Sequence, residues 1–253
     1  MQDNKQKRLA TVILAAGKGT RMESDMAKVL HSICEKPLLH FPVSTARTIG
    51  SEKIVVVIGH QAEQIKEVMD DETLVYAYQE QQLGTAHAVM QSEDELRTFG
   101  GTILILCGDV PLLLPVTLKN LLACHRKGNA AVTVMTAIPP DASGYGRVVK
   151  DENGTVLRIV EERDATVEEK EISEINTGIY CVESAFIYDA LAEIGNNNAQ
   201  GEYYLTDIFE IANRHGHRAQ AFTISDPLEA MGINTVAQLA EAEQIMKARG
   251  KPL

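Results

Sequence analysis

The stretch LATVILAAGKGTRM, residues 9–22, joins a short apolar run to a glycine-rich turn that carries Lys18 and Arg21. The apolar run is nearly continuous, as in strands that are covered on both faces of a parallel sheet. Ligands of open α/β sheets bind at the carboxyl ends of the strands, where backbone N–H groups of such a turn can hold phosphates. The stretch therefore predicts an α/β fold with a phosphate-binding loop after its first strand.

Two known phosphate-loop motifs do not fit this turn. A dinucleotide fingerprint requires G-x-G-x-x-G, and Met22 stands where a third glycine should follow Gly17 and Gly19. The P-loop spacing G-x-x-x-x-G-K-[ST] is absent. Two alternatives remain open at this point. One is a loop that wraps a triphosphate, with Arg21 and Lys28 as neutralising cations, and the other is a tight glycine turn with surface cations.

Composition limits the classes of function. The chain has 253 residues, of which 45% are hydrophobic and 23% are charged, as in ordinary globular domains. Its net charge of −11 argues against a nonspecific nucleic-acid partner. The polar N-terminus and the lack of any apolar run near the roughly 20 residues of a membrane span predict a cytoplasmic protein without a membrane partner. The four cysteines form no CxxC pair, which favours thiols in a reducing compartment over a zinc site.

The first 140 residues alternate β-branched runs with helical patterns. We expect strands at 9–16, 53–59, 73–78, 102–108 and 130–138, and helices at about 37–50, 61–70, 84–98 and 115–127. Pro37 and Pro115 suit the first turn of a helix, whereas Pro42 should kink its helix or shift the start. The alternation predicts a Rossmann-like, doubly wound and mostly parallel sheet.

The pattern changes after residue 140, which predicts an inserted mixed β region. We expect a hairpin closed by Asn153-Gly154, a solvated acidic surface, and a helix that ends at Gly216. The expected ranges are 146–162 for the hairpin, 161–174 for the acidic surface, 174–182 and 218–224 for strands, and 203–216 and 235–250 for helices.

We expect a single domain over residues 1–253. Its parts are a nucleotide-binding core at about 9–140, an acceptor-binding part at about 141–230, and a C-terminal helix at 234–253.

Several motifs follow one another in a specific order. LAAGKGTRM (14–22) with KVLH (28–31) resembles the nucleotidyltransferase superfamily that activates sugars. The later motifs are EQQLGTAHA (80–88), GDVPL (108–112), GYGR (144–147), EINTG (174–178) and NNNAQGEYYLTD (196–207). In this order, over about residues 9–240, they resemble the pyrophosphorylase half of bacterial N-acetylglucosamine-1-phosphate uridyltransferases. GxGTRM is shared by many relatives, whereas EINTG together with NNNAQGEYYLTD is far more specific.

The resemblance implies a reaction. It is the Mg²⁺-dependent transfer of UMP from UTP to N-acetylglucosamine-1-phosphate, which yields UDP-N-acetylglucosamine and pyrophosphate for cell-wall precursor synthesis. The alternatives are another sugar phosphate such as glucose-1-phosphate, another nucleotide, or a catalytically silent nucleotide-sugar sensor. The family usually continues into a β-helix acetyltransferase domain built on hexapeptide repeats, and the sequence shows no such repeat. We therefore expect no acetyltransferase activity, and a monomer or weak homo-oligomer.

Asp109 ends an apolar strand, where a carboxylate requires a cation or hydrogen-bond donors. This position favours a Mg²⁺ ligand, and the alternative is a turn aspartate before Pro111. The resemblance implies Asn234 as the second ligand, for which the alternative is a helix N-cap. Arg21 and Lys28 are expected to stabilise the charge that builds on the triphosphate during transfer.

The remaining site residues follow from the same resemblance. A glutamine such as Gln79 offers both a donor and an acceptor to a base edge, although a solvated strand end is the alternative. For Glu161 and Asn176 the alternatives are an acidic surface and a strand-end turn. The expected nucleotide-binding residues are Leu14, Ala15, Ala16, Gly17, Lys28, Gln79, Gly84, Thr85, Cys107 and Gly108. The expected sugar-binding residues are Gly146, Glu161, Asn176, Tyr204 and Thr206.

Three positions depart from the family pattern. Ala27 stands where a proline commonly precedes Lys28, which we expect to loosen the end of the loop. Cys107 stands where an aromatic residue is frequent, which we expect to change the width of the nucleotide site. The arginine often found soon after Asn234 is missing.

Overall fold

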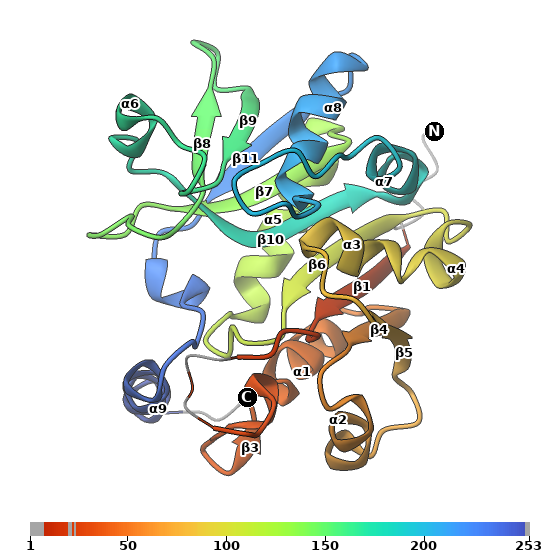
Figure 1. The fold of residues 1–253 in the computed structure, drawn as a ribbon, viewed down its shortest axis with the longest axis vertical. Helices are drawn as coiled ribbons and strands as arrows, with labels where there is room; N and C mark the ends of the chain where they lie inside the picture. The colour runs from red at the N-terminus through yellow and green to blue at the C-terminus, as the bar shows by residue number, and fades with distance from the viewer. Residues whose placement is uncertain (1–7, 20–21, 23, 251–253) are drawn as a thin grey trace.

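The computed structural model describes residues 8–19, 22 and 24–250 (Figure 1). Its strands are β1 (Leu9–Leu14), β2 (Ser32–Ile33), β3 (Lys36–Pro37), β4 (Lys53–Ile58), β5 (Val75–Tyr78), β6 (Thr102–Cys107), β7 (Val132–Ala137), β8 (Arg147–Lys150), β9 (Val156–Val160), β10 (Ile175–Glu183) and β11 (Ala219–Thr223). The main sheet has the order β11-β7-β10-β6-β1-β4-β5, and the β8–β9 hairpin joins it through β10.

Helices cover both faces of this sheet. The α-helices are α1 (His40–Thr48), α2 (Ala62–Met69), α3 (Thr85–Met90), α4 (Glu93–Leu96), α5 (Pro115–Gly128), α6 (Val167–Lys170), α7 (Ser184–Leu191), α8 (Ile208–Arg214) and α9 (Val236–Ala248). Short 3₁₀ helices are η2 (Lys28–Leu30), η3 (Leu205–Asp207) and η4 (Pro227–Ala230). In Figure 1 the β8–β9 hairpin and α6 lie at one end of the long axis, and α9 and β3 lie at the other.

Two hydrophobic cores sandwich the sheet, because successive side chains of a strand point to opposite faces. Val12 packs into a core that also includes buried side chains of α3, α4, α7 and α8. Its neighbour Ile13 packs into the other core, against α1, α2 and α5. A third, smaller cluster holds α9 against the β2–β3 ribbon through Ile33, Phe41 and Met246. This arrangement confirms the predicted doubly wound α/β class.

The sheet is mostly parallel, as predicted, with one antiparallel strand near its middle. β1 runs parallel to β4 and β6, β4 runs parallel to β5, and β7 runs parallel to β11. β10 is antiparallel to both of its neighbours, β6 and β7. The expected mixed region is therefore not separate from the main sheet. Its strand β10 is an inner member of that sheet, and the β8–β9 hairpin is the part that projects from it.

Most strand predictions are confirmed, with bounds that differ from the expected ones by at most two residues at either end. β1, β4, β5, β6 and β7 correspond to the five strands expected before residue 140, and β10 and β11 to those expected after it. Pro115 begins α5, as predicted, and Pro42 falls in the first turn of α1, whose start has moved to His40. The prediction for Pro37 was wrong, because Pro37 pairs with Ser32 in the β2–β3 ribbon.

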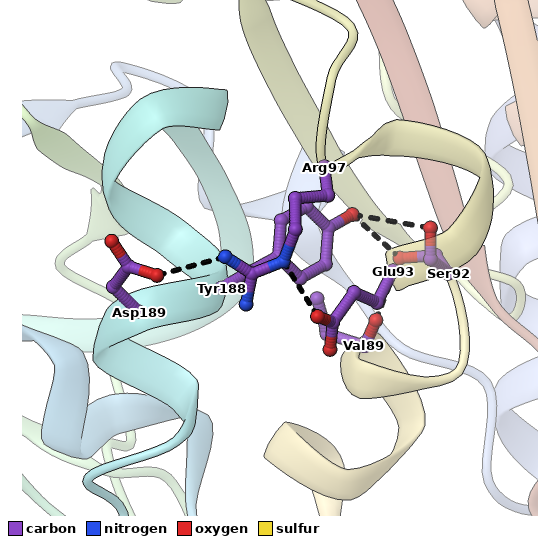
Figure 2. Close-up of polar contacts among 6 residues, drawn as sticks. All are labelled: Val89, Ser92, Glu93, Arg97, Tyr188 and Asp189. Carbon is purple, nitrogen blue, oxygen red and sulfur yellow. Dashed lines mark hydrogen bonds and ion pairs between the residues drawn. The ribbon is translucent and has the colours of Figure 1, made fainter.

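The helix expected at 84–98 is two helices, α3 and α4, which meet at Ser92. The Ser92 hydroxyl donates to the carbonyl oxygen of Val89 at 2.6 Å and lies 3.0 Å from the hydroxyl of Tyr188 on α7 (Figure 2). Local side-chain bonds of this kind compete with the helical ladder and favour a break. The helix expected at 203–216 is also shorter, since α8 starts only at Ile208.

A polar cluster joins α4 from the first half of the chain to α7 from the second (Figure 2). Arg97, the residue that follows α4, donates to Glu93 at the start of that helix at 2.6 Å and to Asp189 on α7 at 2.8 Å. Tyr188 is buried beside it, which raises the pKa of its hydroxyl to about 12. The hydroxyl therefore keeps its proton at neutral pH and can donate to Ser92. α7 itself was not predicted.

Two further predictions after residue 140 need correction. Five residues, rather than two, separate the paired strands of the hairpin, because the Asp151 carboxylate accepts from the N–H groups of Asn153 and Thr155 and builds a wider turn. The acidic stretch is not simply solvated. It contains α6, and Glu162 pairs with buried Arg147 at 2.8 Å.

All four cysteines are free thiols, and burial raises the pKa of the Cys181 thiol far above its usual value. Among the described residues, no helix is both long and apolar enough to span a membrane.

The effect of burying the Asp207 carboxyl, at the start of α8, can be measured from the pH dependence of stability. Burial and the carboxylates of Glu210 and Asp164 raise the pKa of Asp207 to about 6. A carboxyl whose pKa is raised on folding adds stability below its unfolded pKa and loses that contribution as pH rises through about 6. At pH 7 we expect Asp207→Asn to raise the free energy of unfolding by up to about 1 kcal/mol, after allowance for solvent screening.

Urea unfolding at pH 7 and pH 4.5 measures this effect. The gain should shrink at the lower pH, where Asp207 itself is protonated in the folded state. Asp94→Asn, in the first turn of α4, is the matched control and should change little at either pH. A gain for Asp207→Asn that is equal at both pH values would contradict the assignment.

Candidate active site

The carboxyl ends of β1, β4 and β6 bring the first predicted site residues together. Ala15 donates from its backbone N–H to Val57 at 2.9 Å, and Gly108 donates to Leu14 at 2.9 Å. The side chain of Gln82 donates to the carbonyl oxygen of Ala16 at 2.7 Å. Parallel pairing places these strand ends along one edge of the sheet. The predicted nucleotide residues 14–17 and 107–108 therefore adjoin one another there.

Lys28 is the centre of the charged part of the site. Its Nζ donates to the Asp109 carboxylate and, at 3.1 Å, to Oδ1 of Asn234. The phosphate loop packs on the same lysine. Gly19 has a φ of +64°, and a Cβ added there would lie 2.5 Å from Cβ of Lys28. Arg21, the other predicted cation, lies outside the described residues.

Gln61 holds the end of the phosphate loop and was not predicted. Its Oε1 accepts from the backbone N–H of Ala27, and its Nε2 donates to the carbonyl oxygen of Asp25 at 2.6 Å. Gln61 itself adopts the left-handed conformation, with a φ of 55°, immediately before α2. The loop end beside Ala27 is thus tied to the start of α2 by a side chain. Only the folded arrangement brings these segments together.

Gln79 is not the solvated strand-end residue that was its alternative. It is 4% exposed, and its Nε2 donates to the carbonyl oxygen of Gly84 at 3.0 Å and lies 3.1 Å from Nδ1 of His87. Because its amide nitrogen is engaged in this way, Oε1 is the group that it can present to a ligand.

The turn at 83–86 and the segment at 203–205 form one joint. Tyr203 donates from its backbone N–H to Leu83 at 2.8 Å, and its carbonyl oxygen accepts from Ala86 at 2.9 Å. The Thr85 hydroxyl accepts from the N–H of Leu205 at 3.0 Å. Residues expected to contact the nucleotide are therefore hydrogen-bonded to residues next to those expected to contact the sugar.

The predicted sugar residues come from four segments: the residue before β8, the residue after β9, the start of β10, and residues 204–206. The backbone N–H of Asn176 donates to Gly146 at 2.8 Å, and the Thr206 hydroxyl donates to Glu161 at 3.1 Å. Burial raises the pKa of Glu161, while the hydrogen bond from Thr206 lowers it. Glu161 is thus a partly buried, hydrogen-bonded carboxyl and not part of a solvated surface.

Tyr204 is buried and donates from its hydroxyl to the carboxylate of Asp164 at 3.1 Å. Asp164 also accepts from the backbone N–H of Ala199 at 2.9 Å, so it holds the 199–204 segment near Glu161. Asp164 was not singled out in the sequence, where it is one of many acidic residues. A cavity of about 290 Å³ opens here, lined in part by Glu161, Asp164 and Tyr204.

A larger cavity of about 880 Å³ lies away from these residues, at the opposite edge of the sheet. Its lining includes the residues that precede β7 and β11.

Cys107, one of the residues expected to contact the nucleotide, bonds to β10, which carries Asn176, one of the residues expected to contact the sugar. Its thiol donates to the carbonyl oxygen of Gly178 on β10, with 3.5 Å between the two atoms. Burial raises the pKa of the Cys107 thiol to about 12, so it is uncharged at neutral pH. The thiol therefore contacts β10 as a small neutral group.

The donor set beside Lys28 is suited to a hard cation. Among the described residues there is no cluster of three or more His, Cys, Asp or Glu side chains with metal-binding geometry. Asp109 and Asn234 nevertheless direct two oxygen atoms toward one lysine nitrogen. One carboxylate and a neutral oxygen, completed by water and phosphate oxygens, match the usual coordination of Mg²⁺.

A family model and several curated proteins match most of this chain. A family model described as nucleotidyl transferase matches residues 10–227. Proteins named bifunctional protein GlmU from Geobacter metallireducens and Geobacter sulfurreducens are 50% and 49% identical over 242 residues, which is 95% of this chain and 51% of each relative. The protein of that name from Pelotomaculum thermopropionicum is 51% identical over 241 residues, with 95% and 52% covered.

The chain spans about half the length of the curated relatives it matches. The family match itself runs from β1 through the phosphate loop, the strand ends and the acceptor segments to η4. Because this match covers well over half of the chain, the chain belongs to the nucleotidyl transferase family.

Proposed function

We propose that this protein transfers UMP from UTP to N-acetylglucosamine-1-phosphate in the presence of Mg²⁺, forming UDP-N-acetylglucosamine and pyrophosphate. The observation that carries the proposal is the contact of Lys28 with both Asp109 and Asn234 at the phosphate-loop end of the sheet. The motifs EINTG and NNNAQGEYYLTD support N-acetylglucosamine-1-phosphate as the acceptor. A cytoplasmic location and a monomer or weak homo-oligomer belong to the same proposal.

The chemistry requires few protein groups. A phosphate oxygen of the acceptor attacks the α-phosphorus of UTP, and the bond from that phosphorus to the leaving pyrophosphate breaks. The attacking phosphate is already ionised at neutral pH, so no general base has to remove a proton. Lys28, with Arg21 as a proposed second cation, stabilises the negative charge that builds on the phosphate oxygens.

Asp109 and Asn234 are the residues that would hold Mg²⁺. When bound, the ion neutralises phosphate charge and orients the triphosphate. Lys28 contacts both of these side chains, so it would act beside the ion on the same phosphates.

The two sides of the site have separate tasks. The nucleotide is bound at the strand ends by residues 14–17 and 107–108. Gln79 presents its Oε1 to an edge of the base. A carbonyl-type oxygen accepts from the N3–H of uracil, whereas cytosine has an acceptor at that position. On the acceptor side, Gly146, Glu161, Asn176, Tyr204 and Thr206 offer polar groups to sugar hydroxyls and to an acetamido group.

Pyrophosphate release over a grid of substrates tests the proposal directly. Four nucleoside triphosphates are combined with N-acetylglucosamine-1-phosphate or glucose-1-phosphate, with and without Mg²⁺. We expect release only with UTP, the N-acetylated sugar and the metal. Release with a different pair of nucleotide and sugar phosphate would support the proposed type of reaction but change the proposed substrates. Tight UTP binding by folded protein without any release would favour a nucleotide-sugar sensor instead.

Asp109→Asn tests the proposed metal role with a nearly isosteric change. We expect turnover to fall at least ~100-fold, because metal-held charge contributes several kcal/mol to the transition state. Thermal unfolding should show that the variant stays folded. Asp141→Asn, on an exposed loop, is the carboxylate control and should keep near-normal turnover. Turnover by Asp109→Asn within a fewfold of the parent at saturating Mg²⁺ would refute the assignment.

Asn176→Ala tests the proposed acceptor pocket. Because its backbone lies beside Gly146 and its side chain belongs to the acceptor side, we expect the KM for the sugar phosphate to rise about tenfold or more. The KM for UTP should change less than twofold. Steady-state kinetics with each substrate varied in turn measures both values, and the opposite pattern would move Asn176 to the nucleotide side.

A further inference from the structure

The carboxamide oxygen of Asn176 is held by two donors from its own strand. The backbone N–H of Gly178 donates to Oδ1 at 2.9 Å, and the hydroxyl of Tyr180 donates to the same atom at 2.9 Å. An amide oxygen has two lone pairs, and these two bonds use both of them. The two N–H bonds on Nδ2 are then the groups that Asn176 can offer to a ligand.

A bulge in β10 produces this arrangement. Asn176 lies opposite Thr136 of β7 and Tyr180 lies opposite Val134, so four steps along β10 face only two along β7. Gly178, inside the bulge, has a φ of +76°, and a Cβ there would lie 3.0 Å from Sγ of Cys107. Bulges of this kind re-aim side chains next to functional sites. Here the bulge brings a backbone N–H and the hydroxyl of Tyr180, four residues further along the strand, to one oxygen.

Tyr180 is rigidly placed for this contact. Its side chain is 3% exposed, and its ring packs against that of Phe209, with 6.0 Å between the ring centroids. Burial and the nearby Glu161 raise the pKa of the Tyr180 hydroxyl well above its usual value. The hydroxyl therefore carries its proton throughout the working pH range and remains a donor. The backbone N–H of Gly178 can only donate, so it excludes the flipped amide, in which Nδ2 would face that N–H, and the Tyr180 hydroxyl adds the second bond to Oδ1.

We propose that Tyr180 is a positioning residue that, together with the backbone N–H of Gly178, holds the orientation of the Asn176 carboxamide, so that Asn176 presents only hydrogen-bond donors to the acceptor. This inference rests on the proposed function for the identity of the acceptor. The group that meets Asn176 must then be an oxygen that accepts, such as a sugar hydroxyl oxygen, an acetyl carbonyl or a phosphate oxygen. A substrate that offers only a donor at that place, such as an ammonium group, is disfavoured.

Tyr180→Phe removes the hydroxyl and keeps the ring that packs on Phe209. The Asn176 carboxamide then loses one of the two bonds that set its orientation. We expect the KM for the sugar phosphate to rise roughly three- to tenfold, with kcat and the KM for UTP within twofold of the parent. Equal changes in both KM values, or none, would overturn the positioning role.

Tyr188→Phe is the matched control. Tyr188 is also buried, and its hydroxyl contacts Ser92 in the cluster of Figure 2. Both variants lose one buried hydroxyl, so they should lose similar stability on urea unfolding. Only Tyr180→Phe should raise the KM for the sugar phosphate. A rise of the same size in Tyr188→Phe would show that the effect is a general consequence of lost stability.

Asn176→Asp tests which atoms face the substrate. An aspartate keeps an oxygen for the bonds from Gly178 and Tyr180 but replaces the amide donors with a second oxygen. We therefore expect a KM for the sugar phosphate at least as high as that of Asn176→Ala. Near-normal KM in Asn176→Asp would show that the donors are not used and would overturn the inference.

A measurement that does not depend on enzymatic turnover separates this inference from the proposed function. The side-chain amide signals of Asn176 are assigned in a ¹H–¹⁵N spectrum by their loss in Asn176→Ala. They should shift in Tyr180→Phe and stay unchanged in Tyr188→Phe. If no substrate pair reacts but this pattern holds, the function fails and the orientation stands. Asn176 signals that are unaffected by Tyr180→Phe overturn the orientation, whatever the activity.

Discussion

The antiparallel pairing of β10 between β6 and β7 is the constraint on which the site depends. Since β10 runs against its neighbours, its first residues lie where β6 and β7 end, beside the edge that is proposed to bind phosphates. Asn176 thereby comes close to Cys107, whose thiol contacts Gly178. A parallel strand in the same place would bring its final residues to this edge and put Asn176 at the other. Asn176, a proposed acceptor residue, therefore takes its position from the hydrogen-bond ladder of the sheet.

Much of the fold follows from local sequence. Continuous apolar runs such as 9–14 predict buried parallel strands, and the turn after them predicts the phosphate loop, because both signals lie within a few residues. The shifted start of α1 follows from Pro42 in the same way. The break in the 84–98 helix was missed although its local cause, the Ser92 hydroxyl bonded to Val89, is near in sequence, and the contact of the same hydroxyl with Tyr188 forms only on folding. The inner place of β10 likewise depends on pairing between distant strands.

The candidate site also contains residues with a local sequence signal and residues whose contacts arise only on folding. Asp109 stands out in sequence because a carboxylate ends an apolar strand, and the family resemblance supplies Asn234 and the sugar residues. Gln61, Asp164 and Tyr180 carry no such signal. Each acts through a hydrogen bond to a backbone atom or side chain that only folding brings near. Supporting residues are therefore the part of the site that sequence patterns leave out, although they determine how the recognised residues point.

The bond from Lys28 to Asn234 joins residues 206 positions apart in the chain. During synthesis the chain emerges from its N-terminus, so the phosphate loop, both cores and the acceptor segments leave the ribosome before Asn234 does. Closing a connection of this length also comes late in folding, because the intervening elements must first bring its ends together. The nascent protein can thus acquire most of its sheet while its charged centre is still incomplete, and the centre is completed only when nearly the whole domain is available.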